Sequence, residues 1–189
     1  MTSPTNGGWY IVPWGLSLGL LIAVLALLCL YLLGQSRTCY EQLVGASGDN
    51  ERRELLFRMR QHELSDQCES DVAQYLMEHP NCSPLLRDRL HFTLSQSGYR
   101  DADFVRWVLD VEAFNQNQDW RLDAWGYLLN SEIVLPEAIL LKAANFEARE
   151  KDAGRYADPM IRDCIGRIGR NQYPHSTWWE ELISPTYGR

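Results

Sequence analysis

The chain has 189 residues and a formal net charge of −7, and 46% of its residues are hydrophobic. This acidic balance disfavours a nucleic-acid partner, because phosphate backbones are bound by basic faces. About 150 residues follow the first hydrophobic stretch, and that length is enough for one domain with its own core.

A hydrophobic stretch without any charged residue runs from Trp14 to Leu33. At about 1.5 Å per residue, a helix of this length spans about 30 Å, the thickness of the hydrocarbon core of a bilayer. A signal peptide is the competing interpretation. No Lys or Arg precedes the stretch, however, and its apolar core exceeds the usual length of about 7–15 residues. The sequence therefore predicts a single transmembrane helix.

Small residues recur at every fourth position of this stretch, at Gly15, Gly19 and Ala23. Such a pattern permits close approach of a second membrane helix. Glycine is frequent in membrane helices, so a chance match is an equal alternative. The partners we expect are the lipid bilayer and, through this helix or the helical domain, another membrane protein.

The orientation follows from the basic residues beside the stretch. Arg37, Arg52 and Arg53 come after it, whereas no Lys or Arg precedes it. The positive-inside rule then places the C-terminal part in the cytoplasm, although long domains can cross a membrane regardless of charge. The 16 Arg against only Lys142 and Lys151 fit a GC-rich bacterial genome. We expect a bacterial inner membrane with a cytoplasmic C-terminal domain, and a periplasmic domain is the alternative.

Composition divides the chain into four segments. They are an N-terminal tail with the transmembrane helix (1–36), a juxtamembrane linker rich in Gly and Ser (37–49), a helical domain (50–170) and an aromatic C-terminal tail (171–189).

Capping residues and apolar spacings of three and four residues predict about seven helices after residue 49. Their expected starts are Asn50, Asp66, Pro84, Asp101, Asp119, Pro136 and Pro159. No segment alternates apolar and polar residues with the period of a strand, so the expected class is all-α. A compact bundle and stacked helical pairs of the HEAT or TPR kind both fit these helix lengths. The helices that begin with proline are not evenly spaced, so no repeat family is assigned.

Four cysteines follow the hydrophobic stretch, at positions 39, 68, 82 and 164. They can form disulfides in an oxidising compartment. A bond between Cys68 and Cys82 is excluded, because an intervening helix would separate them by about 15–20 Å. We favour buried, reduced thiols that act as small hydrophobic side chains.

No motif predicts a catalytic, cofactor-binding or metal-ligating residue. None of His62, His79, His91 and His175 has a paired ligand spacing, and no cofactor is expected. His79 and Cys82 form an H-x2-C pair, but Cys68 would lie too far away to complete a zinc site.

Large apolar residues mark the C-terminal tail, among them Trp178, Trp179, Leu182 and Tyr187. Each aromatic removes about 150–250 Å² from water when it is buried, so a free tail is disfavoured. We expect the tail to dock on the helical domain. The alternative is that it anchors a partner.

These observations predict a single-pass, membrane-anchored interaction or assembly subunit, such as a scaffold or accessory component of a membrane complex. The alternative is a membrane-anchored all-α enzyme, such as a hydrolase, that assembles dispersed carboxylates with His91 or His175. A deep polar cleft containing a histidine would favour the enzyme, whereas a grooved apolar surface would favour the interaction subunit.

Overall fold

The computed structural model describes residues 22–28, 38–61, 64–153 and 158–182. The chain divides into two compact units after Arg37. In the first unit, residues 22–28 are helical and exposed, and they include Ala23. The rest of the expected span from Trp14 to Leu33, with Gly15 and Gly19, lies outside the described residues. Among the residues that are described, no helix is both long enough and apolar enough to cross a membrane.

The second unit is all-α, as expected, and its described residues contain no strand. Its elements are α2 (Cys39–Gly45), α3 (Asp49–Arg60), α4 (Asp66–Glu78), α5 (Pro84–Ser97), α6 (Ala102–Trp107), the π-helix η1 (Val108–Glu112), α7 (Gln118–Asn130), α8 (Glu137–Asp152) and α9 (Pro159–Gln172). Each expected helix start lies within one residue of an observed start, in α3 to α9.

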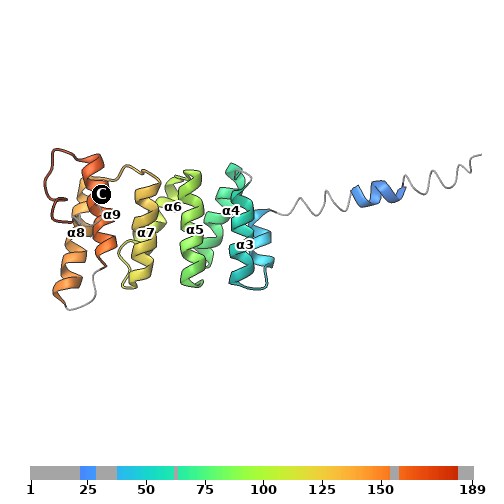
Figure 1. Ribbon diagram of the computed structural model, residues 1–189, viewed down its shortest axis with the longest axis horizontal. Helices are drawn as coiled ribbons and strands as arrows, with labels where there is room; N and C mark the ends of the chain where they lie inside the picture. The colour runs from blue at the N-terminus through green and yellow to red at the C-terminus, as the bar shows by residue number, and fades with distance from the viewer. Residues whose placement is uncertain (1–21, 29–37, 62–63, 154–157, 183–189) are drawn as a thin grey trace, which may run out of the picture. The chain divides into compact units, whose positions relative to one another are not determined.

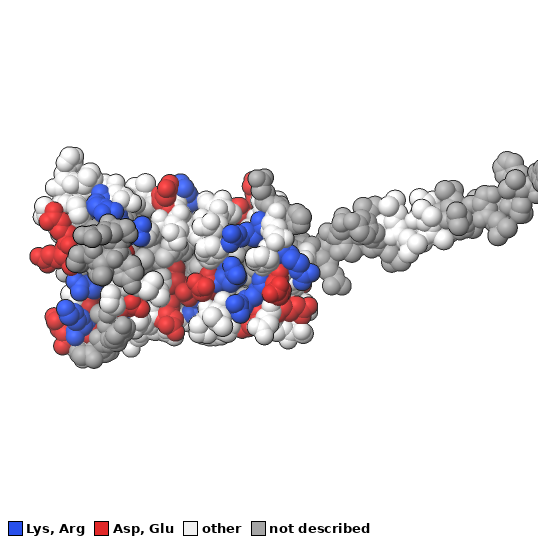
Figure 2. Space-filling model, viewed as in Figure 1, with Lys and Arg blue, Asp and Glu red and all other residues white. Residues whose placement is uncertain are grey.

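The helices form antiparallel pairs that stack side by side in a row (Figure 1). The pairs are α2 with α3, α4 with α5, α6–η1 with α7, and α8 with α9. The second helices of the pairs pack on one another along the row, from α3 through α5 and α7 to α9. On the face that Figure 1 presents, basic side chains gather over α3 and its border with α5, and acidic ones gather between α5 and α7 (Figure 2).

Helix α2 lies within the segment 37–49, which we expected to be a linker. It begins with a capping box, in which the Thr38 hydroxyl accepts from the Glu41 backbone N–H and the Glu41 carboxylate accepts from that of Thr38. Leu43 is fully buried, and α2 packs on α4. The folded unit therefore begins at Thr38.

A disulfide joins Cys39 of α2 to Cys68 of α4, and the two Cα atoms lie 5.2 Å apart. The expectation of reduced thiols is wrong for this pair, because the packing of α2 on α4 brings together cysteines that are 29 residues apart in sequence. Cys82 and Cys164 are free. Burial raises the pKa of the Cys164 thiol to about 11, so it is protonated at neutral pH.

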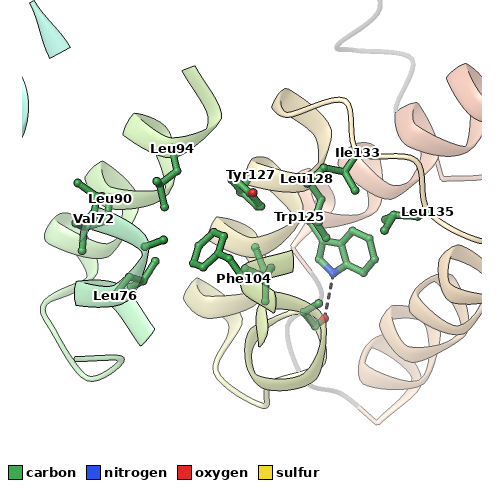
Figure 3. Packing of buried hydrophobic residues seen from close by; sticks show 14 of the residues in the cluster. Val72, Leu76, Leu90, Leu94, Phe104, Trp125, Tyr127, Leu128, Ile133 and Leu135 are labelled. Carbon is green, nitrogen blue, oxygen red and sulfur yellow. Dashed lines mark hydrogen bonds between the residues drawn. The ribbon is translucent and has the colours of Figure 1, made fainter. Parts of the chain in front are cut away.

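The core runs continuously through the row (Figure 3). On α6 and η1, Phe104 and Val108 are fully buried, whereas Val105 and Leu109 are only partly buried. Phe104 contacts Tyr127 edge to face, with ring centroids 5.3 Å apart. This contact joins the two helices of the third pair. The Phe104 ring also lies 6.2 Å from the His91 ring of α5, centroid to centroid, which joins the third pair to the second.

Candidate functional site

An arginine occupies the fourth position of the second helix in every pair. These residues are Arg52 in α3, Arg87 in α5, Arg121 in α7 and Arg162 in α9. In each of the first three pairs, the guanidinium donates hydrogen bonds to backbone carbonyls at the turn before its own helix or, for Leu43, in the last turn of the preceding helix. The repeated arginine thus ties the two helices of a pair together.

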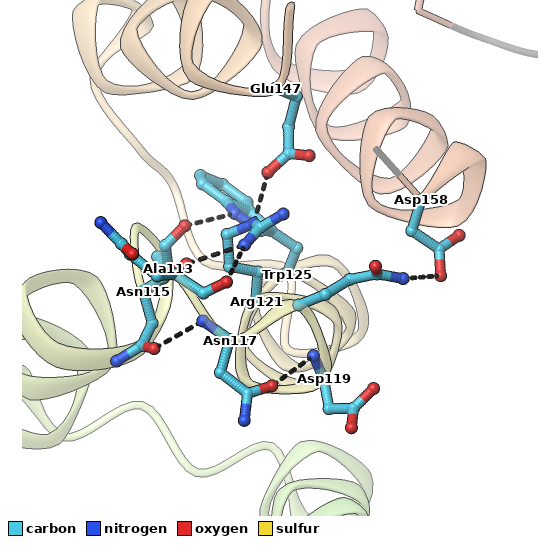
Figure 4. Close-up of polar contacts among 10 residues, drawn as sticks. Ala113, Asn115, Asn117, Asp119, Arg121, Trp125, Glu147 and Asp158 are labelled. Atoms are coloured by element: carbon cyan, nitrogen blue, oxygen red, sulfur yellow. Dashed lines mark hydrogen bonds and ion pairs between the residues drawn. The ribbon is translucent and has the colours of Figure 1, made fainter. Parts of the chain in front are cut away.

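The third pair shows this arrangement most completely (Figure 4). Arg121 Nη1 donates to the carbonyl oxygens of Asn115 and Gln116, at 2.8 and 3.1 Å. Its Nε donates to Glu147 Oε1 of α8 at 2.7 Å, and both side chains are 1% exposed. Burial raises the pKa of the Glu147 carboxyl, although the hydrogen bond from Arg121 opposes this effect. The ion pair joins the third pair of helices to the fourth.

The corresponding acid between the second and third pairs is Glu112, at the end of the π-helix η1. Its Oε1 lies 3.9 Å from Arg87 Nε, and its Oε2 lies 2.7 Å from His91 Nε2. Glu112 and Glu147 both lie ten residues after the first residue of the first helix of their pair, at 102 and 137. In α4 the same position holds the buried Leu76, so Arg52 has no such acid and pairs with Asp49 instead.

Asp123 lies beside this cluster, where burial raises the pKa of its carboxyl to about 7 against the opposing charge of His91. A histidine with two carboxylates is what the enzyme alternative requires. His91 and Glu112, however, are 3% and 0% exposed, so they offer almost no surface to a substrate. We interpret the cluster as a structural connection between helical pairs. Within the part of the chain that the structure describes, no three His, Cys, Asp or Glu residues could hold a metal ion.

The tail residues that the sequence singled out lie against the last pair of helices, with the exception of Tyr187, which is outside the described residues. Trp178 and Leu182 pack against the core, and Trp178 Nε1 donates to Glu137 Oε1 at 2.9 Å. A hydrogen bond from Ser176, together with this one from Trp178, holds the pKa of the Glu137 carboxyl below its usual value.

Trp179 is held differently, because its Nε1 donates to the carbonyl oxygen of Tyr173, within the tail itself, at 3.0 Å. Arg162 Nη2 donates to the carbonyl oxygen of Glu181 at 3.2 Å. The repeated arginine of α9 therefore contacts the tail, where the arginines of α5 and α7 contact a following pair of helices.

Two hollows follow the surface seam between α3 and α5. One has a volume of ≈ 360 Å³ and is lined by Asn50, Arg53, Glu54, Phe57 and Arg89. The other has a volume of ≈ 460 Å³ and is lined by Arg60, Leu64, Glu69, Thr93, Gln96 and Ser97.

A third hollow, of ≈ 390 Å³, separates α6 and η1 from α8, and its apolar lining includes Val105, Leu109, Phe114 and Ile139. Neither His91 nor Glu112 lines any of these hollows.

The recurrence of these arginines with their acids was not expected from the sequence. The available signal was spacing, since Arg87 and Arg121 are 34 residues apart and Glu112 and Glu147 are 35 apart. Comparisons with protein-family models, with curated proteins and with solved structures found no match.

Proposed function

We propose that the chain is a single-pass, membrane-anchored helical subunit that binds another protein, as a scaffold or an accessory component of a membrane complex. The observation that carries this proposal is the row of stacked helical pairs, whose surface is hollowed along the borders between helices. Grooves of this kind accept peptide segments or helices of a partner. The burial of the His91 cluster weighs against the membrane-anchored enzyme.

The membrane anchor in this proposal is the uncharged stretch from Trp14 to Leu33. Its small residues Gly15, Gly19 and Ala23 would let a helix of the partner approach closely. The anchor would confine the helical domain to the membrane surface, where it meets its partner at a raised effective concentration.

We further propose that the helical domain faces an oxidising compartment, such as the bacterial periplasm. The Cys39–Cys68 disulfide supports this placement, because glutathione and thioredoxin keep such cysteines reduced in the cytoplasm. The basic residues after the membrane stretch favour the opposite side, but long domains cross regardless of charge. We give the disulfide more weight, and this reverses the orientation expected from Arg37, Arg52 and Arg53.

The orientation predicts the outcome of a reporter fusion at Arg189. A reporter that is active only outside the cytoplasm should give a signal. In denatured full-length chain, an alkylating reagent should label Cys39 and Cys68 only after reduction, while Cys82 and Cys164 are labelled without it. A silent reporter together with free thiols at positions 39 and 68 would place the domain in the cytoplasm.

The function itself is tested by purifying the full chain in a mild detergent and identifying the proteins that co-purify by mass spectrometry. We expect one membrane protein at a fixed stoichiometry, and a weaker association after Gly19→Leu, because leucine prevents close helix approach. A chain that elutes without any stoichiometric partner would contradict the proposal. Hydrolytic activity lost in Glu112→Gln would instead favour the enzyme.

A further inference from the structure

Two arginines converge on one aromatic ring at the seam between α3 and α5. The Arg60 guanidinium carbon lies 4.9 Å from the centroid of the Phe92 ring, and that of Arg89 lies 5.8 Å from it. Within the described residues, neither guanidinium forms a salt bridge with a carboxylate. Two like charges held at one ring repel each other, and an anion placed between them would relieve that repulsion.

A third arginine extends this basic surface. Arg53 lines the same hollow as Arg89, and it also has no salt-bridge partner among the described residues. Its Nε is buried, and no protein atom in the described part of the chain accepts a hydrogen bond from it. Because this nitrogen and the rest of the guanidinium have no acceptor within the described residues, no internal partner competes with a ligand for Arg53.

An apolar contact lies between the charges. Phe57 is 46% exposed and stands on the face of α3 that carries Arg53 and Arg60, with spacings of four and three residues. Figure 2 shows basic side chains gathered over this part of the surface, although the chain as a whole is acidic. The seam thus offers positive charge on both sides of an exposed aromatic ring.

The shape of the seam selects among anions. From Arg53 to Arg60 the helix rises about 10 Å, which exceeds the reach of a single phosphate group. The hollows of ≈ 360 and ≈ 460 Å³ lie one after the other along α3, as an extended chain requires. A membrane surface fits less well, because it needs a broad basic face and the net charge of −7 would oppose its approach.

We infer that the seam between α3 and α5 binds an acidic peptide segment of the partner, in which carboxylates alternate with apolar side chains. Arg53, Arg60 and Arg89 would bind the carboxylates, since the planar guanidinium matches a carboxylate in a bidentate geometry. Phe57 and Phe92 would contact the apolar side chains. This inference rests on the proposed function and specifies the chemistry of its partner.

The test uses the full chain in detergent and a fluorescent 12-residue peptide of alternating Glu and Leu, measured by fluorescence anisotropy. We expect binding that weakens as salt rises, because exposed charge pairs are screened. Replacing both Arg53 and Arg89 by Gln should weaken binding at least tenfold. The matched control is Arg58→Gln, which removes an arginine of the same helix that lines neither hollow and should change binding less than twofold.

Other outcomes overturn the inference. If Arg58→Gln weakens peptide binding as much as the double substitution does, the peptide is attracted by net charge alone. If the wild-type chain does not bind the peptide, the seam is not a peptide site. If vesicles of anionic lipid bind in an Arg53- and Arg89-dependent manner and the peptide does not, the ligand is lipid. The proposed function is judged separately. If a partner still co-purifies with the doubly substituted chain, the seam is not its binding site, and the proposed function stands. If the wild-type chain binds the peptide but no partner co-purifies with it, the proposed function is refuted.

Discussion

Replacing Glu147 by Ala is expected to lower the free energy of unfolding by about 3–5 kcal/mol. The substitution leaves the guanidinium of Arg121 buried, at 1% exposure, without its carboxylate. The carbonyls of Asn115 and Gln116 accept hydrogen bonds from it but carry no net charge to offset its desolvation. Urea unfolding of the full chain in detergent, followed by circular dichroism, measures the change.

Two further variants test whether the loss of stability comes from leaving a buried charge without its partner. Replacing Arg121 by Met and Glu147 by Leu together should restore most of the lost stability, because apolar side chains of similar volume need no partner. The control is Asp103→Ala, which breaks an ion pair with Arg106 whose side chains are 83% and 71% exposed. It should cost less than about 1 kcal/mol. If Glu147→Ala is as stable as this control, the explanation that it leaves a buried, uncompensated charge at Arg121 is wrong.

The same arginine position gives a different contact at each end of the row. In the first pair, Arg52 is 19% exposed and paired with Asp49, and α4 carries the buried Leu76 at the position where the later pairs present an acid. Arg162 in the last described pair donates to the carbonyl of Glu181 in the tail. The tail therefore occupies the place that a further helical pair would take, as a capping element does in a stacked row.

Helix starts were predictable because their signals are local. Ser65 and Asp101 accept hydrogen bonds from backbone N–H groups of the first turns of α4 and α6, and Pro84 and Pro159 stand at the first position of α5 and α9. These signals need no knowledge of the rest of the fold. Helix α2 also begins with a local signal, the capping box of Thr38 and Glu41, but the neighbouring Gly and Ser residues favoured the interpretation as a linker.

Contacts between distant segments were not predictable in the same way. The Cys39–Cys68 disulfide depends on the packing of α2 against α4, which no local pattern encodes. The repeat was missed because the helices that begin with proline mix first and second members of pairs. When only the first helices of the pairs are compared, α4, α6 and α8 begin at 66, 102 and 137, with spacings of 36 and 35 residues. The buried acids Glu112 and Glu147 are 35 residues apart, as are the starts of α6 and α8.

Replacing Gly169 by Ala is expected to destabilise the domain by about 1–3 kcal/mol and to release the tail. A Cβ atom at this position would lie 2.6 Å from Cη2 of the rigid Trp178 ring and 3.0 Å from Cβ of Trp179. At a position in a helix interior where the added Cβ contacts no other atom, the same change would stabilise the domain by about 0.5–1 kcal/mol. The sign of the effect therefore reports whether the tail is docked. Hydrogen exchange of residues 173–182, measured by mass spectrometry, should become faster.

Two variants test this explanation. Gly126→Ala in α7 is the matched control, because a Cβ there meets nothing within 4 Å, so it should stabilise the domain. Adding Trp178→Ala to Gly169→Ala removes the clash, so the double variant should be at least as stable as Trp178→Ala alone. If Gly169→Ala stabilises the domain as Gly126→Ala does, Trp178 does not rest on α9 in solution. The aromatic tail would then be free to bind a partner, since self-docking is what keeps its tryptophans from other surfaces.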